Sequence, residues 1–217
     1  MILKRISRQR YIKRVGMLRN KKAILLSGGM DSIALAYWLR PEVAITLDYG
    51  QKAAEAEIAA AARVAQLLRI EHYVLRIDCS SLGSGDLVGS KPISDAPITE
   101  WWPYRNQMLV TLALMKAIQL NVCELMVGSV KTDAQHLDGT PEFYEQLSIL
   151  VSMQEGGIKV TAPAIGMTTV ELVRQCGIPE NILMYAHSCH TANHPCGKCH
   201  GLSLIHISEP TRLALIS

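Results

Sequence analysis

Apolar and polar positions alternate between two patterns along this chain. Short, continuous apolar runs, typical of strands buried on both faces, occupy residues 23–26, 43–47, 73–77, 124–128 and 158–162. Segments in which apolar residues recur every three or four positions occupy residues 31–40, 53–69, 104–120, 141–154 and 168–176. This alternation predicts an α/β fold, a doubly wound, mainly parallel five-stranded sheet with helices on both faces.

The ends of three predicted strands carry the polar residues of interest. Ligands of parallel sheets bind beyond the carboxyl ends of the strands. The candidates there are Leu26, Ser27, Gly28, Gly29, Met30, Asp31 and Ser32 after the first strand, Asp48, Tyr49 and Gln51 after the second, and Gly128, Lys131 and Asp133 after the fourth. The long polar connection at residues 79–100 is expected to form a mobile flap near them.

Residues 27–32 have the pattern of a phosphate-binding turn. A strand, a Gly-rich turn and a helix place backbone N–H groups and a helix N-terminus against an anion, and Gly28 and Gly29 permit close approach. A carboxylate at Asp31 fits such a site when Mg²⁺ is present, since Mg²⁺ prefers oxygen ligands. The chain is therefore expected to bind a nucleotide. The alternative is an ordinary turn in which Asp31 caps the helix.

Length and charge limit the function classes. With 217 residues the chain suits one domain with a substantial core. No apolar run reaches the about 18 residues of a membrane span, and no secretory signal is evident, so a cytoplasmic protein is expected. Nine of the 22 basic residues lie in the first 22 positions, so the remainder has 13 basic and 19 acidic residues, a net of −6. An acidic body disfavours nucleic acid as a partner.

The two ends of the chain differ from its body. Residues 1–21 are interpreted as a basic arm that either binds RNA or is a solvated tail; a third interpretation is that translation begins at Met17. Residues 22–178 are assigned to the nucleotide-binding α/β domain and residues 179–201 to a cysteine module. Residues 202–217 have no helical period and resemble translated sequencing-adapter sequence, so we exclude them from the fold.

Three late cysteines have metal-ligand spacing. Cys189, Cys196 and Cys199 give C-x6-C-x2-C, and two thiolates separated by two residues can reach one Zn²⁺. A repeat of the short spacing would put the fourth ligand at position 202, which is Leu202, the first residue of the foreign-looking tail. A histidine (His190, His194 or His200) or water is the alternative fourth ligand, and three buried thiols are the reading without a metal.

The loop and the cysteines together resemble one known family. Residues 27–32, Ser-Gly-Gly-Met-Asp-Ser, match the SGGxDS signature of the PP-loop ATP pyrophosphatases, which cleave ATP between its α- and β-phosphates and adenylate an acceptor. With the cysteine pattern, the chain from about Lys22 to Gly201 resembles the QueC family of queuosine biosynthesis. Further segments similar to the family are Asp48–Gln51, Arg105-Asn106, Gly128, Asp133 and Pro141–Phe143.

This resemblance implies a fold like the adenine nucleotide alpha hydrolases and a ligase reaction. The substrates would be 7-carboxy-7-deazaguanine, ammonia and ATP, the product the nitrile preQ0, the metals Mg²⁺ and Zn²⁺, and the assembly a homodimer. Asp31 would hold Mg²⁺. Arg105 would pair with a phosphate or the substrate carboxylate, or else form a surface ion pair.

Other assignments keep an alternative. Lys131 would stabilise pyrophosphate or be a solvated loop lysine. Asp133 would hydrogen-bond the purine-like edge or cap a turn, and Asn106 would contact the nucleotide.

Two departures from the family bear on the acceptor. The residue before Arg-Asn is usually small in the family but is Tyr104 here, and residues 136–140 replace a Tyr-Pro-Asp-Cys-Arg-like run. An adenylating enzyme with a protein amine or tRNA as acceptor is therefore a second hypothesis. A zinc-stabilised nucleotide- or RNA-binding module without enzymatic activity is a third.

Overall fold

One parallel sheet organises the protein. The computed structural model describes residues 20–94, 96, 101–154, 156–187, 189, 192 and 193. The strands are Lys21–Leu25 (β1), Val43–Asp48 (β2), Glu71–Arg76 (β3), Val122–Met126 (β4) and Lys159–Thr161 (β5). Their order is β3-β2-β1-β4-β5, and each neighbouring pair is parallel. The predicted five-stranded parallel sheet is confirmed, with strand ends within two residues of expectation.

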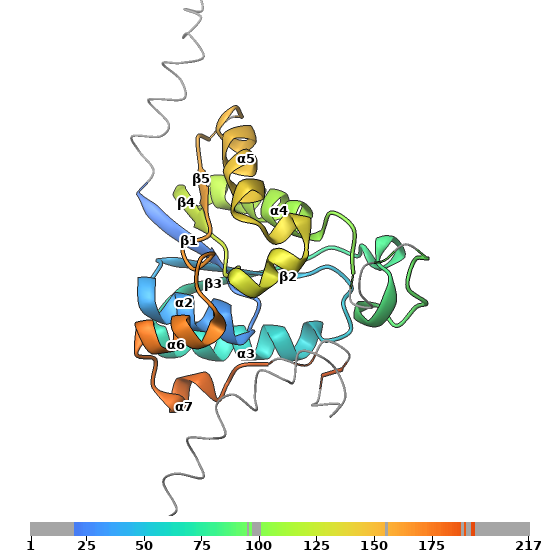
Figure 1. Cartoon of the computed structure of the whole chain (residues 1–217). Helices are drawn as coiled ribbons and strands as arrows, with labels where there is room; N and C mark the ends of the chain where they lie inside the picture. The colour runs from blue at the N-terminus through green and yellow to red at the C-terminus, as the bar shows by residue number, and fades with distance from the viewer. Residues whose placement is uncertain are drawn as a thin grey trace, which may run out of the picture.

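Helices cover both faces of this sheet (Figure 1). They are Met30–Leu39 (α2), Ala54–Leu68 (α3), Arg105–Gln119 (α4), Pro141–Ser152 (α5), Thr169–Cys176 (α6) and Glu180–Leu183 (α7). Helices α4 and α5 lie on one face, and α2, α3 and α6 lie on the other. Five helices were predicted; α7 was not, because a helix of one turn has no measurable period.

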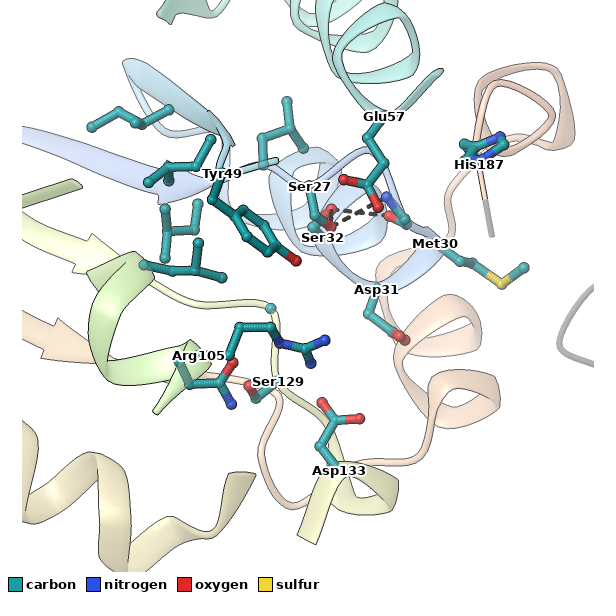
Figure 2. A pocket seen from close by; sticks show the side chains of 18 of the residues that line it. Ser27, Met30, Asp31, Ser32, Tyr49, Glu57, Arg105, Ser129, Asp133 and His187 are labelled. Atoms are coloured by element: carbon teal, nitrogen blue, oxygen red, sulfur yellow. Dashed lines mark hydrogen bonds between the residues drawn. The ribbon is translucent and has the colours of Figure 1, made fainter. Parts of the chain in front are cut away.

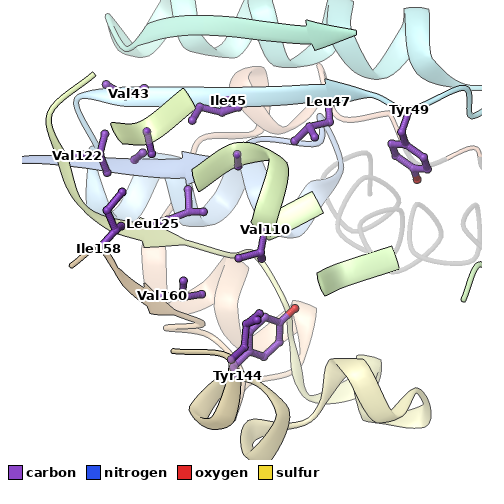
Figure 3. Packing of buried hydrophobic residues seen from close by; sticks show 14 of the residues in the cluster. Val43, Ile45, Leu47, Tyr49, Val110, Val122, Leu125, Tyr144, Ile158 and Val160 are labelled. Carbon is purple, nitrogen blue, oxygen red and sulfur yellow. The ribbon is translucent and has the colours of Figure 1, made fainter. Parts of the chain in front are cut away.

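The alternation of side chains along β1 divides the core in two. Ala23 packs toward α4 and α5 with Val43, Ile45 and Leu125 (Figure 3). Ile24 packs toward α2, α3 and α6 on the opposite face. Both faces of a central parallel strand are thus buried, which explains its unbroken apolar sequence.

The connections reverse direction at β1. The chain passes from β1 through α2 to β2 on one side, and β4 occupies the other side of β1. A crevice forms at such a switch point, beyond the carboxyl ends of the strands. The turn at residues 27–32 follows β1 directly and therefore lies at this crevice.

A buried hydroxyl holds the last residue before that turn. Thr46 Oγ1 donates a hydrogen bond of 2.6 Å to the Leu26 carbonyl and lies 2.8 Å from His72 Nε2. Because the single hydroxyl proton points to Leu26, His72 Nε2 must carry the proton that Thr46 accepts. Burial also lowers the pKa of His72, so its neutral form is favoured.

The segment after β3 is more ordered than a plain loop. It contains two short 3₁₀ turns, Ser80–Leu82 (η1) and Gly85–Leu87 (η2). Leu87 is buried, and its carbonyl accepts from Lys52 N at 2.9 Å. Ser84 Oγ donates to the Trp101 carbonyl at 2.7 Å. This part packs against the domain, and movement of residues 79–100 as a flap stays a prediction.

Several expectations concern residues that the structure does not describe. The basic arm at residues 1–19, the tail at 202–217, and Cys196 and Cys199 lie outside the described residues, so the division into an arm, a domain, a module and a tail stays a prediction. In the part that is described, no helix is both long and apolar enough to traverse a bilayer.

Helix α4 begins next to a strained residue. Tyr104, its N-cap, has φ 57° and ψ 19°, the left-handed region that disfavours residues with a Cβ, and its side chain is 79% exposed.

We expect Tyr104→Gly to raise the free energy of unfolding by about 1 kcal/mol, because glycine adopts this conformation without the Cβ clash. Urea denaturation measures the change. Tyr104→Ala is the matched control: it removes the exposed ring but keeps the Cβ, so it should give no gain. Equal gains from both variants would show that the ring, and not the backbone, is the source of strain.

Candidate functional site

One cavity of about 280 Å³ lies at the switch point of the sheet (Figure 2). The predicted site residues that line it are Leu26, Ser27, Gly29, Met30, Asp31, Ser32, Tyr49, Arg105, Asn106, Gly128 and Asp133. These residues come from the ends of three strands and from the start of α4. The structure therefore brings most of the predicted site together.

The turn after β1 is held by its own serines. Ser32 Oγ donates to the Gly29 carbonyl at 2.9 Å, and its oxygen lies 3.1 Å from Ser27 Oγ. Ser27 Oγ in turn accepts from Gly29 N at 3.3 Å. Because Ser32 uses its proton on Gly29, Ser27 is the donor between the two hydroxyls. The turn is thus fixed before any ligand arrives.

Two glycines allow neighbouring elements to approach this turn. Gly28 has φ +81°, and a Cβ there would lie 2.4 Å from the Glu57 carbonyl of α3. A Cβ on Gly128, after β4, would lie 3.0 Å from Ser32 Cα. The position of Gly28 requires glycine, and at Gly128 any larger residue would be tightly packed. Helix α3 and the loop after β4 therefore both pack directly on the phosphate loop, which we define as residues 27–32.

Asp31 and Asp133 both line the cavity, from the first turn of α2 and from the 3₁₀ turn Lys131–Gln135 (η3). Burial raises the pKa of Asp31 from 3.8 to about 6; Thr169 opposes this rise and Asp133 adds to it. Among the described residues, Asp31 Oδ1 and Thr169 Oγ1 are nevertheless buried without a hydrogen bond of standard geometry. Burial also raises the pKa of Asp133.

This pair fits a divalent cation. A buried carboxylate oxygen without a partner is costly, and a cation between two carboxylates relieves both their burial and their repulsion. Mg²⁺ usually takes one or two carboxylates and fills the rest of its shell with water and phosphate oxygens.

Asp133 also closes a turn. Its Oδ2 accepts from Val130 N at 3.0 Å, so the turn-capping alternative is correct. One carboxylate oxygen therefore fixes the loop after β4, and the residue still lines the cavity. The two readings of Asp133 are compatible.

Arg105 is the cation of the cavity wall, and its guanidinium points toward the two carboxylates (Figure 2). Burial by itself lowers its pKa, but the charges of Tyr49, Asp138, Glu57 and Asp133 outweigh burial and raise the pKa. Arg105 is therefore charged and faces the cavity, which excludes the reading as a surface ion pair. A fork of N–H donors in this place suits a phosphate or a carboxylate.

Asn106 connects α4 to a neighbouring turn. Its Nδ2 donates to the Asp138 carbonyl at 2.8 Å, and its backbone N donates to Asp138 Oδ2 at 3.2 Å. Asp138 belongs to the 3₁₀ turn Leu137–Gly139 (η4). These bonds fix the start of α4, and with it Arg105, relative to the loop after β4.

Gln51 acts behind the wall. Its Oε1 accepts from Tyr49 N at 2.8 Å, and its Nε2 donates to the Leu47 carbonyl at 3.1 Å and to Glu57 Oε2 at 2.8 Å. It is buried and does not line the cavity. Its amide thereby orients Tyr49 and Glu57, which do line it.

The remaining predicted residues also lie off the cavity wall. Gly28 is the residue of the phosphate loop that packs against the Glu57 carbonyl of α3. Asp48 accepts from Gly50 N at 3.2 Å and lies 3.7 Å from Arg76 Nε, so its contacts are with its own loop and strand β3. Lys131 is exposed at the start of η3.

Three polar residues of the wall were not predicted: Glu57, Ser129 and His187. Glu57 could have been predicted from the sequence, because it shares a helix face with the buried residues Ala53, Ala60 and Ala61. A carboxylate on such an apolar face does not contribute to the core, which points to a function. Burial raises its pKa, which Gln51 and Arg105 oppose. Nothing in the local sequence distinguishes His187.

The cysteine module is described only in part. Cys189 is buried, and Cys196 and Cys199 lie outside the described residues. The zinc site therefore stays a prediction.

The pKa of Asp31 predicts how stability depends on pH. The folded, metal-free protein holds this proton more tightly than the unfolded chain, so the free energy of unfolding should fall as pH rises from about 4 to about 6. We expect Asp31→Asn to be more stable than the parent protein at pH 7.5 and to lose that advantage near pH 4. Urea denaturation in EDTA at both pH values measures it.

Asp78→Asn is the control, because hydrogen bonds from Ser80 lower the pKa of Asp78 and the neutral-pH gain should be absent. A gain for Asp31→Asn that is the same at both pH values would contradict the assignment.

Comparisons with known proteins point to one family. The sequence profile of the family described as "Queuosine biosynthesis protein QueC" matches residues 21–204. The 7-cyano-7-deazaguanine synthase of Pseudomonas aeruginosa (strain LESB58) is 30% identical over 224 residues, 90% of this chain and 99% of the relative. That of Nitrosomonas eutropha is 29% identical, over 88% and 96%.

Among solved structures, NMN synthetase from Francisella tularensis aligns with a TM-score of 0.47 and 18% identity, over 86% of this chain and 78% of that chain. The family profile covers most of the sequence, and the relatives match almost from end to end. The chain belongs to the QueC family.

Proposed function

We propose that this protein is a 7-cyano-7-deazaguanine synthase, an ATP-dependent carbon–nitrogen ligase. The observation that carries the proposal is that the phosphate loop, Asp31, Asp133 and Arg105 line one and the same cavity, in a chain of the QueC family. The names of the relatives supply the product, 7-cyano-7-deazaguanine.

The reaction consists of two activations of one carbon atom. A carboxylate loses oxide poorly, so its oxygen first attacks the α-phosphorus of ATP, which gives an acyl adenylate and releases pyrophosphate. Ammonia then displaces AMP and forms the amide. The amide oxygen then attacks the α-phosphorus of a second ATP and releases a second pyrophosphate, and loss of AMP and of the two amide protons leaves the nitrile of preQ0. Each of the two activations by ATP replaces a poor leaving group with AMP.

The predicted site residues have separate tasks in this scheme. Ser27, Gly28, Gly29 and Ser32 form the turn at the start of α2 that would receive the phosphates. Arg105 holds the substrate carboxylate or the α-phosphate by two parallel N–H donors. We assign Lys131 to the leaving pyrophosphate, which its flexible side chain would reach from η3.

Two metals belong to the proposal. Asp31, with Asp133 beside it, would hold Mg²⁺, which offsets the negative charge that develops on pyrophosphate. Cys189, Cys196 and Cys199 would hold Zn²⁺ in a structural role. A homodimer and a cytoplasmic location are further expectations from the family.

The identity of the acceptor, the molecule that the enzyme adenylates, is the point on which a second hypothesis differs. Tyr104, exposed and in a left-handed conformation, precedes the cavity residue Arg105, and Leu137 in η4 is 90% exposed. Two large apolar side chains therefore lie exposed on the two segments that Asn106 and Asp138 join. They motivate the second hypothesis, an adenylating enzyme that acts on a protein amine or on tRNA.

Product analysis tests the proposal. The full chain, with Leu202→Cys to supply a fourth thiol, is incubated with MgATP, ammonium and 7-carboxy-7-deazaguanine, and products are identified by mass spectrometry. We expect preQ0, AMP and pyrophosphate. AMP that forms only when protein or tRNA is added, without preQ0, would move the assignment to the second hypothesis. Absence of AMP from folded protein would overturn both.

Variants of the two cations test their roles. Arg105→Lys should lower kcat/KM about 100-fold, because an ammonium cannot make the paired contact of a guanidinium. Lys131→Ala should lower kcat about tenfold, a smaller loss because the side chain is exposed. Lys91→Ala, also exposed but on the segment after β3, is the control and should leave both constants unchanged. A loss from Lys131→Ala no larger than that from Lys91→Ala would remove Lys131 from the site.

A further inference from the structure

The chain that follows α7 returns to the phosphate loop. His187 donates its backbone N–H to the Gly28 carbonyl at 2.8 Å and lines the cavity. The position of a Cβ on Gly29 would be 3.9 Å from the His187 carbonyl. Figure 2 shows His187 beside the turn that precedes α2. More than 150 residues separate the two partners along the chain.

This bond acts on one peptide unit of the phosphate loop. The Gly28 carbonyl and the Gly29 N–H belong to the same planar peptide group and point in opposite directions. His187 holds the carbonyl from one side, and Ser27 Oγ accepts the N–H from the other at 3.3 Å. The orientation of this peptide is therefore set from both sides, and the peptide lies in the middle of the loop that we assign to phosphate.

The His187 ring closes the segment on itself. Nε2 lies 3.0 Å from the Cys189 carbonyl and 3.1 Å from the Ala192 carbonyl. Both carbonyls only accept, so Nε2 carries a proton and donates to both. The ring thereby holds the backbone of residues 189 and 192 next to residue 187.

A second contact reaches the helix behind the loop. Asn193 Oδ1 accepts from Ala56 N at 3.2 Å, in the first turn of α3. The first N–H groups of a helix have no partner within it, and the N-cap of α3 is Ala53, which offers no side-chain acceptor. Asn193 thus supplies a missing cap. The same helix packs on Gly28 through the Glu57 carbonyl.

We propose that His187 and Asn193 are positioning residues of the nucleotide site. They dock the segment after α7 against both the phosphate loop and α3, and so fix the Gly28–Gly29 peptide in the orientation that receives a nucleoside triphosphate. The inference rests on the proposed function only in taking the loop as a phosphate site. Because coupling is reciprocal, a bound nucleotide should also hold the segment in place.

Binding without turnover tests this role. The dissociation constant of α,β-methylene-ATP with Mg²⁺ is measured by titration calorimetry on the full chain, without acceptor. His187→Ala should weaken binding about tenfold and raise KM for ATP more than it lowers kcat, because the segment loses the ring bonds that hold residue 187 in place to donate its backbone N–H to Gly28, while the reacting groups remain. His187→Gln, whose amide also donates N–H bonds, should recover most of the affinity.

Asn193→Ala should weaken binding about threefold, as expected for one exposed hydrogen bond. Asn181→Ala is the matched control: Asn181 is exposed on α7 with no side-chain hydrogen bond among the described residues, so affinity should not change. Circular dichroism confirms that each variant is folded.

The outcomes separate the two ideas. Equal affinities for the parent protein, His187→Ala and Asn193→Ala would overturn the positioning role while the proposed function stands. A loss in His187→Ala that His187→Gln does not restore would also overturn the role of the ring. If the parent protein does not bind the nucleotide, both the inference and the proposed function fail.

Discussion

The contact between Gly28 and the Glu57 carbonyl is the constraint on which the site depends. There is no room for a Cβ, and the backbone is left-handed, so the position requires glycine for two reasons at once. Glycine there lets α3 lie directly against the phosphate loop. The close packing then brings the Glu57 side chain into the cavity wall and places Gln51 behind it. The absence of a Cβ at this one position thus allows residues that follow β1 and residues that follow β2 to line the same cavity.

The cavity is built around charges whose burial is unfavourable without a ligand. Asp31, Asp133 and Glu57 all have raised pKa values because they are removed from water, and Arg105 opposes the rise only at Asp133 and Glu57. Buried polar groups are normally satisfied by the protein itself. Here Asp31 Oδ1 and Thr169 Oγ1 are left without a hydrogen bond of standard geometry among the described residues. The protein gives up stability at this place, as ligand sites commonly do.

The fold could be predicted from the sequence because the hydrophobic pattern of each strand matches the burial of that strand in the sheet. Unbroken apolar runs such as that of β2 have only one explanation in an α/β chain, burial on both faces. The strand ends then placed Ser27, Tyr49 and Asp133 at one edge without any knowledge of contacts. The turn at residues 180–183 was missed because four residues cannot display a helical period.

The site itself was predictable only where the residues follow strand ends. Asp48 and Gln51 were assigned to the nucleotide, but the direction of a side chain within a turn is set by tertiary hydrogen bonds, and theirs point to Arg76, Tyr49 and Glu57. Glu57 could be recognised from the sequence as a carboxylate on an otherwise apolar helix face. His187 could not be recognised, because it contacts Gly28 through its backbone N–H, which every residue except proline possesses.

The contact between Ala56 and Asn193 spans 137 positions of the sequence. Proteins emerge from the ribosome from the N-terminus, and a domain generally folds as a unit. The phosphate loop and the start of α3 are among the first parts of this domain to be made, whereas Asn193 is the last residue that the structure describes. The cap that Asn193 gives to α3 can therefore form only after residue 193 has been synthesised, long after the helix that it caps.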